Sequence, residues 1–155
     1  MNEEQVTQIR DSFARVEGRA ELVALLFYKR LFELAPHLQR LFLGDIEAQS
    51  HKFMQMVQTA VLLADAPALL IPTLKSLGRR HALYGLTDEH YRVTGRAFLW
   101  ALGEALGSDV STRELNAWSA FFDFLSVTMQ DGTSLGEVGS QVSALGGRKV
   151  TASAI

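Results

Sequence analysis

The chain has 155 residues, a length that fits one domain, and hydrophobic residues make up 48% of it, enough for a sizeable core. A formal net charge of −2 gives no basic field for a nucleic-acid partner, and the absence of cysteine excludes disulfides, thiolate metal sites and thiol nucleophiles. No signal-like start opens the chain, and no apolar run approaches the ~18 residues of a membrane-spanning helix, so we expect a soluble cytoplasmic protein.

Apolar residues at helical spacing predict helices along nearly the whole chain, and no alternating pattern indicates a strand. The second expected helix is apolar on most of its circumference, which is typical of a helix buried on several sides. The fold class predicted from this pattern is all-α. In chain order, the expected helices end at Gly18, then cover about residues 20–34, 37–43, 45–64, 73–83 and 88–106, and finish with a helix that buries Leu115 through Met129.

Prolines, glycines and capping residues set the expected boundaries. Pro36 ends the second helix, because its ring disfavours helical geometry at the preceding residue. Pro72 is expected to break the segment that begins near Asp65 and to open a new helix. Residues Ser111–Glu114 have the spacing of a capping box. From residue 132 to 155 the chain is rich in glycine, serine and threonine, so we expect a disordered tail after a domain of residues 1–131.

Most common catalytic and metal-binding patterns are missing from the sequence. The four histidines are not spaced three or four residues apart and form no HExxH motif, which argues against zinc and di-iron carboxylate sites. No GxSxG turn or glycine-rich phosphate loop is present. Haem requires less from a sequence, because one axial histidine, an apolar slot and a distal pocket are enough. The histidines are His37, His51, His81 and His90.

His81 is the candidate axial ligand. Leu77 lies one helical turn earlier, so its carbonyl is placed to accept a hydrogen bond from the ring N–H that a metal leaves free. On the other side, Gln49 and Phe53 are one turn apart on one expected helix, and Tyr28 lies in the apolar second helix, where its hydroxyl needs a partner. Taken alone, each of these residues is better explained as an ordinary core, capping or surface residue, and none by itself indicates a haem.

Taken together, these residues resemble the globin family over about residues 3–130. The run Leu25-Leu26-Phe27-Tyr28 with the later Phe42 is similar to the helix B to CD-corner region of globins. The run Leu77-Gly78-Arg79-Arg80-His81 with the later His90-Tyr91 is similar to helices F and G, and Ala117-Trp118 to helix H. The similarity is greatest to single-domain bacterial haemoglobins, the globin half of flavohaemoglobins, and neuroglobin. It implies a globin fold, a three-over-three helical sandwich around haem b.

The resemblance also implies roles for residues on both faces of the haem. His81 matches the proximal iron ligand, and Phe42 matches the phenylalanine that packs on the haem. Gln49 matches the distal position of helix E, Phe53 the apolar position one turn further, and Tyr28 the helix B position that faces the bound ligand. His51 is two residues past Gln49 and so about 200° around the helix, which excludes it as a sixth ligand.

Two further matches concern the haem edge and the proximal side. Lys52 matches a position from which a basic side chain reaches a haem propionate. Tyr91 matches a tyrosine that supports the proximal histidine together with a glutamate in flavohaemoglobins. The matching position here falls near Thr133, so the resemblance does not extend to a peroxidase-like proximal histidine.

These features predict a protein that reversibly binds O₂, and also NO and CO, with high O₂ affinity from the Tyr28–Gln49 pair. Two alternatives remain open: an NO dioxygenase served by a separate reductase, and a gas sensor that signals to a partner. A helical domain without any cofactor is the fourth reading.

Overall fold

A computed structural model describes residues 1–42 and 44–134, and within those residues the chain is helical and has no strand. This confirms the predicted all-α class. The elements are α1 (Glu3–Glu17), α2 (Ala20–Leu34), the 3-10 helix η1 (Pro36–Leu41), α3 (Ile46–Leu62), α4 (Pro67–Leu83), α5 (Asp88–Leu106), the 3-10 helix η2 (Gly107–Asp109) and α6 (Thr112–Ser134).

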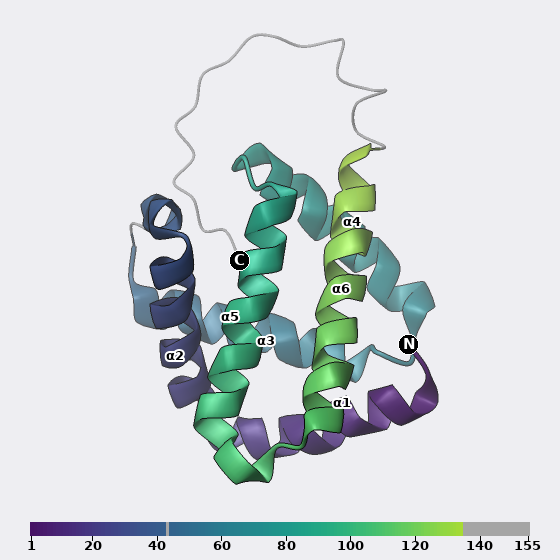
Figure 1. The fold of residues 1–155 in the computed structure, drawn as a ribbon. Coiled ribbons are helices and arrows are strands. Elements are labelled where there is room, and N and C mark those ends of the chain that lie inside the picture. Colours follow the sequence, from purple (N-terminus) through teal and green to yellow (C-terminus); the bar gives the residue numbers. More distant parts are fainter. Residues whose placement is uncertain (43, 135–155) are drawn as a thin grey trace, which may run out of the picture.

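The helices form two crossing layers. In Figure 1, α5 and α6 stand side by side at the front, α3 crosses behind them, and α1 lies across the bottom. Helix α5 contacts α2 and α6 within the front layer, and the layers meet where α4 and α1 pack on α6 and α2 packs on α3. This is the three-over-three arrangement that the sequence resemblance implies.

Side chains next to the helix starts explain where several helices begin. Asn2 and Gln5 form a capping box before α1, with Asn2 Oδ1 accepting from Gln5 N at 2.8 Å and Gln5 Oε1 accepting from Asn2 N at 3.0 Å. The capping box predicted for α6 is also present, since Ser111 N donates to Glu114 Oε2 at 2.7 Å and Glu114 N donates to Ser111 Oγ at 3.2 Å. Each box satisfies two backbone N–H groups that the helix itself leaves without partners.

The prediction that Pro72 breaks the helix is wrong. Helix α4 continues through this residue from Pro67 to Leu83. Pro72 is the sixth residue of α4, so its missing N–H removes only the bond to the carbonyl of Ala68. A proline inside a helix costs about 3 kcal/mol, and close packing of α4 against α6 offsets this cost.

The packing of α4 on α6 depends on two glycines. A Cβ at Gly78 would lie 2.8 Å from the Cα of Met129, and a Cβ at Gly132 would lie 2.7 Å from the Cα of Lys75. Side chains at these positions would therefore hold the two backbones apart. Because Gly132 packs in this way, α6 runs to Ser134, three residues past the predicted end of the domain. The rest of the predicted tail, residues 135–155, lies outside the described residues.

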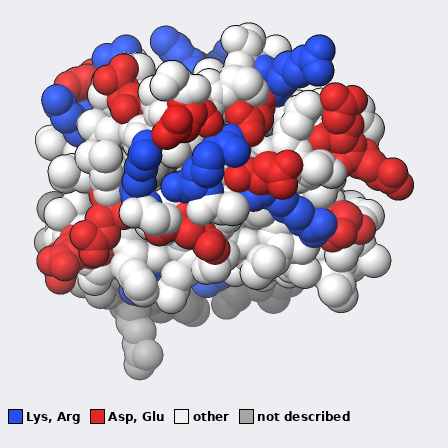
Figure 2. Space-filling model, turned by 90° about the horizontal axis from the view of Figure 1, so that it is seen from below, with Lys and Arg blue, Asp and Glu red and all other residues white. Residues whose placement is uncertain are grey.

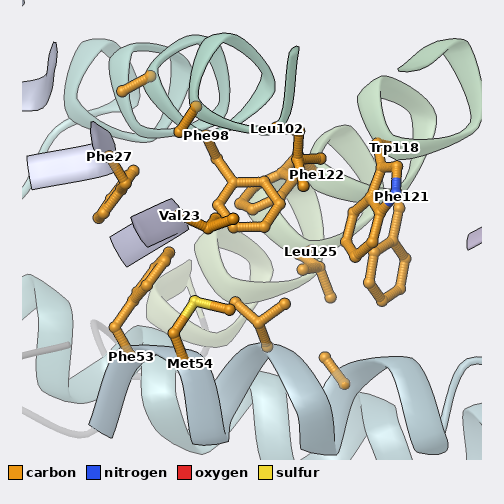
Figure 3. Packing of buried hydrophobic residues seen from close by; sticks show 14 of the residues in the cluster. Val23, Phe27, Phe53, Met54, Phe98, Leu102, Trp118, Phe121, Phe122 and Leu125 are labelled. Atoms are coloured by element: carbon orange, nitrogen blue, oxygen red, sulfur yellow. The ribbon is translucent and has the colours of Figure 1, made fainter. Parts of the chain in front are cut away.

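Aromatic side chains fill the centre between the layers. Figure 3 shows Phe53 on α3 facing Phe27, and the two rings stack with centroids 4.2 Å apart and planes 2° from parallel. Trp118 is fully buried, and its indole N–H donates to Ser12 Oγ at 2.8 Å. The buried indole is therefore satisfied, as polar groups in a core need to be.

Acidic and basic side chains alternate on the face of the molecule seen in Figure 2, and no field of one sign dominates that view. Among the ion pairs are those of Arg10 with Asp65 at 2.7 Å and of Arg19 with Asp109 at 3.3 Å. Exposed pairs of this kind are worth about 0–1 kcal/mol each. None of the described helices combines the length and the apolar character needed to cross a membrane.

Candidate functional site

A mainly apolar cleft lies between η1 and helices α3 to α6. Its cavity volume is about 50 Å³, within about 750 Å³ of space between atoms that includes open solvent. Its walls carry aliphatic and aromatic side chains with a few polar groups, which is the composition of small-molecule sites in general. The polar groups of the lining are His81, His90, Tyr91, Thr94 and Ser126.

The structure brings four of the seven predicted site residues into this cleft: Phe42, Phe53, His81 and Tyr91. Gln49 and Lys52 instead border a smaller hollow that shares Phe42 with the cleft. Tyr28 lines neither space, but its ring packs edge-on against Phe42 and Phe53, with centroids 5.4 and 6.1 Å away. The predicted residues therefore form one connected group.

His81 is the polar centre of the cleft. It lies on α4 with only 5% of its surface exposed, and its Nδ1 is 2.8 Å from the carbonyl of Leu77. A carbonyl only accepts, so Nδ1 carries the ring proton and Nε2 keeps a lone pair. Burial lowers the pKa of His81, and the bond to Leu77 opposes that shift only in part. The ring is thus neutral near pH 7, in the form that binds a metal ion.

Tyr91 lies beside His81, with ring centroids 6.1 Å apart and planes 25° from parallel. Burial, with a smaller contribution from Asp88, raises the pKa of Tyr91, so its hydroxyl stays protonated. Thr133, at the position that the sequence resemblance matches with a supporting glutamate, donates to the carbonyl of Gln130 at 2.6 Å within its own helix. Thr133 gives His81 no carboxylate partner.

Tyr28 carries a buried hydroxyl without a hydrogen-bond partner among the described residues. The residue is 3% exposed and is surrounded by phenylalanine rings. Burial raises the pKa of the phenol strongly, and the Gln49 amide is near enough to lower it slightly without reaching hydrogen-bond geometry with the hydroxyl. An unsatisfied buried group of this kind costs about 1–3 kcal/mol. The hydroxyl is therefore ready to donate to a ligand.

The side chains of α3 near the cleft differ in how deeply they are buried. Phe53 is fully buried, Gln49 is half-buried one turn earlier, and Lys52 is exposed next to it. His51 is exposed and does not line the cleft, in agreement with its predicted direction.

Sequence reasoning missed several residues of the cleft, among them the polar side chains of His90, Thr94 and Ser126, and it missed the contact of His90 with His37. Their Nε2 atoms are 2.7 Å apart, although the residues are 53 positions apart in the chain. No spacing rule predicts such a contact, because it depends on how η1 and α5 meet. Among the described residues, no group of three or more histidines or carboxylates is placed to hold a metal ion.

These residues fit a haem group. A flat apolar ring system matches the apolar walls, and an iron ion in its centre matches the buried, neutral imidazole of His81. A diatomic ligand on the far side would give the Tyr28 hydroxyl the partner that it lacks. The exposed Lys52 is compatible with a haem carboxylate at the edge of the site.

Comparisons with known sequences show which proteins the chain is similar to. The family model described as Globin matches residues 25–129. The anaerobic nitrite reductase HBII of Casuarina glauca is 32% identical over 138 residues, covering 79% of this chain and 86% of its own length. The flavohemoprotein of Chromobacterium violaceum is 30% identical over 129 residues, covering 78% of this chain. The chain spans 30% of that flavohemoprotein and 32% of the flavohemoprotein of Rhodopirellula baltica.

Solved structures share the fold. An engineered carbene transferase from Rhodothermus marinus matches with a TM-score of 0.77 at 23% identity, over 89% of this chain and 97% of its own. A hexacoordinated heme protein from an anhydrobiotic tardigrade matches with a TM-score of 0.76 at 15% identity, over 86% of this chain and 96% of its own. At these identities the likeness concerns the fold alone.

Proposed function

The chain belongs to the globin family, and from that premise we propose that it binds haem b through His81 and holds diatomic ligands, above all O₂, on the opposite face. NO and CO are further ligands of the same site. His81 supplies the axial nitrogen, and the haem iron supplies the position at which a diatomic ligand binds.

The buried, neutral imidazole of His81 is the observation that carries this proposal. Its bond to the carbonyl of Leu77 fixes the tautomer and the ring orientation, and it makes Nε2 a better donor to a metal ion. Tyr91, stacked near the ring, restricts its movement. Both contacts prepare His81 to bind an iron ion without rearrangement.

Tyr28 and Gln49 act on the opposite side. A bound O₂ carries partial negative charge, and the Tyr28 O–H and the Gln49 N–H would each stabilise it by about 1–2 kcal/mol in a dry site. Two such bonds slow ligand release by a factor of about 10–1000, because each 1.4 kcal/mol is tenfold. Phe42 and Phe53 exclude water from this side and keep those bonds strong. We therefore propose high O₂ affinity with slow dissociation.

A second candidate function is redox chemistry on a nitrogen oxide. The flavohemoproteins that the chain resembles, and relatives named as anaerobic nitrite reductases, support it. An NO dioxygenase would need an electron supply. A reductase is the proposed partner for this activity, and turnover of NO with a reductase and NADH tests it.

Absorption spectra and O₂ kinetics test the primary proposal. The purified protein is expected to show a Soret band that shifts on reduction and on CO addition, and His81→Gly is expected to lose most bound haem. Tyr28→Phe is expected to release O₂ about tenfold faster in stopped flow, as loss of one strong bond predicts. His51→Ala, exposed on the same helix as Gln49, is the control and leaves the rate unchanged. Fast O₂ release that Tyr28→Phe does not alter would refute the proposed role of Tyr28.

A further inference from the structure

Two histidines meet where the cleft reaches solvent. His90 lies on the first turn of α5, is half-buried and lines the cleft, whereas His37 lies on η1 and is exposed. Their Nε2 atoms are 2.7 Å apart, and their ring centroids are 5.0 Å apart. The contact therefore ties two walls of the cleft together at its outer edge.

A backbone N–H assigns the protons of this pair. Thr87 N donates to His90 Nδ1 at 3.0 Å, so that nitrogen is an acceptor. A neutral His90 then carries its proton on Nε2 and donates it to Nε2 of His37. A proton added to His90 goes to Nδ1 and displaces the bond from Thr87, while Nε2 still donates to His37. Protons on both rings would place two N–H groups face to face. The contact is therefore lost when both rings are charged.

This proton assignment also disfavours a metal ion between the rings. A metal ion at Nε2 of His90 would require the ring proton on Nδ1, where Thr87 already donates. Two imidazoles also fall short of the usual ligand number, and the described residues add no third ligand nearby. The pair is thus a hydrogen bond between side chains.

Charged groups around the pair are largely engaged elsewhere. Burial lowers the pKa of His90, His37 lowers it further, and Glu89 acts in the opposite direction. Glu89 itself pairs with Arg92 at 2.6 Å. Other charged groups on these elements include Asp88 on α5 and the Arg30–Glu33 pair on α2. Arg40 on η1 donates from Nε to the His37 carbonyl at 3.5 Å. Burial and the neighbouring His37 together favour the uncharged form of His90.

We propose that His37 and His90 form a latch across the edge of the cleft that slows the exchange of haem, and that protonation of both rings opens it. Leu38, which directly follows His37, and Tyr91, which directly follows His90, both line the cleft. Tyr91 also lies against His81. Separation of the rings would therefore loosen the entrance and the support of His81 together. The inference rests on the proposed haem binding.

Transfer of haem to an excess of a haem-free acceptor globin measures the latch. At pH 7.5, His37→Ala is expected to lose haem about five times faster than the unmodified protein, the factor that one ordinary hydrogen bond gives. Between pH 7.5 and pH 5.5 the unmodified protein should accelerate about fivefold more than His37→Ala, so that the two rates converge in acid. Protonation of His81 accelerates both proteins alike and cancels in this comparison.

His51→Ala is the matched control, since it removes another exposed histidine and should keep the rate and pH profile of the unmodified protein. Equal rates for His37→Ala and the unmodified protein at pH 7.5, with Soret bands in both, would overturn the latch and leave the haem proposal intact. Absence of the Soret band in the unmodified protein would overturn both.

A spectroscopic experiment reads the latch without haem loss. In the diamagnetic CO form, ¹⁵N chemical shifts of the imidazoles should show His90 protonated at Nε2, and His37→Ala should alter that signal. Zn²⁺ binding at micromolar concentration that His37→Ala abolishes would mean that the pair is a metal site, and it would refute the proton assignment.

Discussion

Gly78 sets how closely the helix that carries His81 approaches α6. A methyl group there would lie 2.8 Å from the Cα of Met129 and closer still to the carbonyl group of that residue. These are backbone atoms, so no side-chain rotation relieves the overlap, and α4 must shift away from α6. We therefore expect Gly78→Ala to displace His81, which lies three residues further along the same helix.

The size of the effect follows from two opposing contributions. Alanine in a helix is favoured over glycine by about 0.5–1 kcal/mol, whereas overpacking a close contact costs about 1–3 kcal/mol or more. The backbone overlap is severe, so the second contribution dominates. Gly78→Ala should lower the free energy of unfolding by about 1–2 kcal/mol, the overpacking cost less the helix preference of alanine.

Gly103 is the matched control, because it lies inside α5 and a Cβ there meets no atom within 4 Å. Gly103→Ala should raise the free energy of unfolding by about 0.5–1 kcal/mol. Urea unfolding followed by circular dichroism compares the two variants, and the Soret spectrum reports any displacement of His81. A Gly78→Ala protein as stable as Gly103→Ala, with an unchanged spectrum, would refute the close packing of α4 on α6.

Three further predictions concern buried or capping polar groups. Tyr28→Phe removes an unsatisfied buried hydroxyl, so the free energy of unfolding of the O₂-free protein, measured with urea, should rise by about 1 kcal/mol. The same variant should lose O₂ affinity. A lower free energy of unfolding would show that the hydroxyl already has a partner. Ser12→Ala leaves the buried indole N–H of Trp118 without an acceptor and should cost about 1–3 kcal/mol in the same assay, whereas no loss would contradict that bond. Burial acts to raise the pKa of Glu114, but hydrogen bonds from Ser111 and Arg15 outweigh it and hold the pKa below its usual value. The unfolded chain then binds the proton more readily, so stability should fall as the pH drops below about 4.5, and this fall should be weaker in Glu114→Gln; identical acid profiles would exclude the pairing.

Features that depend on neighbours along the chain follow from the sequence alone. The bond between His81 and Leu77 joins residues one helical turn apart, so the spacing itself predicts it once the segment is helical. The capping box of Ser111 with Glu114 is local in the same way. The relative directions of Gln49, Phe53 and His51 on α3 also follow from helical geometry. Local spacing therefore determines the helices and which residues share a face.

Features that depend on how helices meet required the tertiary structure. The helix continues through Pro72, because packing on α6 outweighs a local penalty, and Gly132 is helical because it packs on Lys75 rather than because of its own preference. The contact of His37 with His90 joins residues 53 positions apart, and no pattern within either segment encodes it. Such contacts form only when the helices pack against one another. Packing determines which residues that are distant in the sequence become neighbours and which of them are buried from solvent.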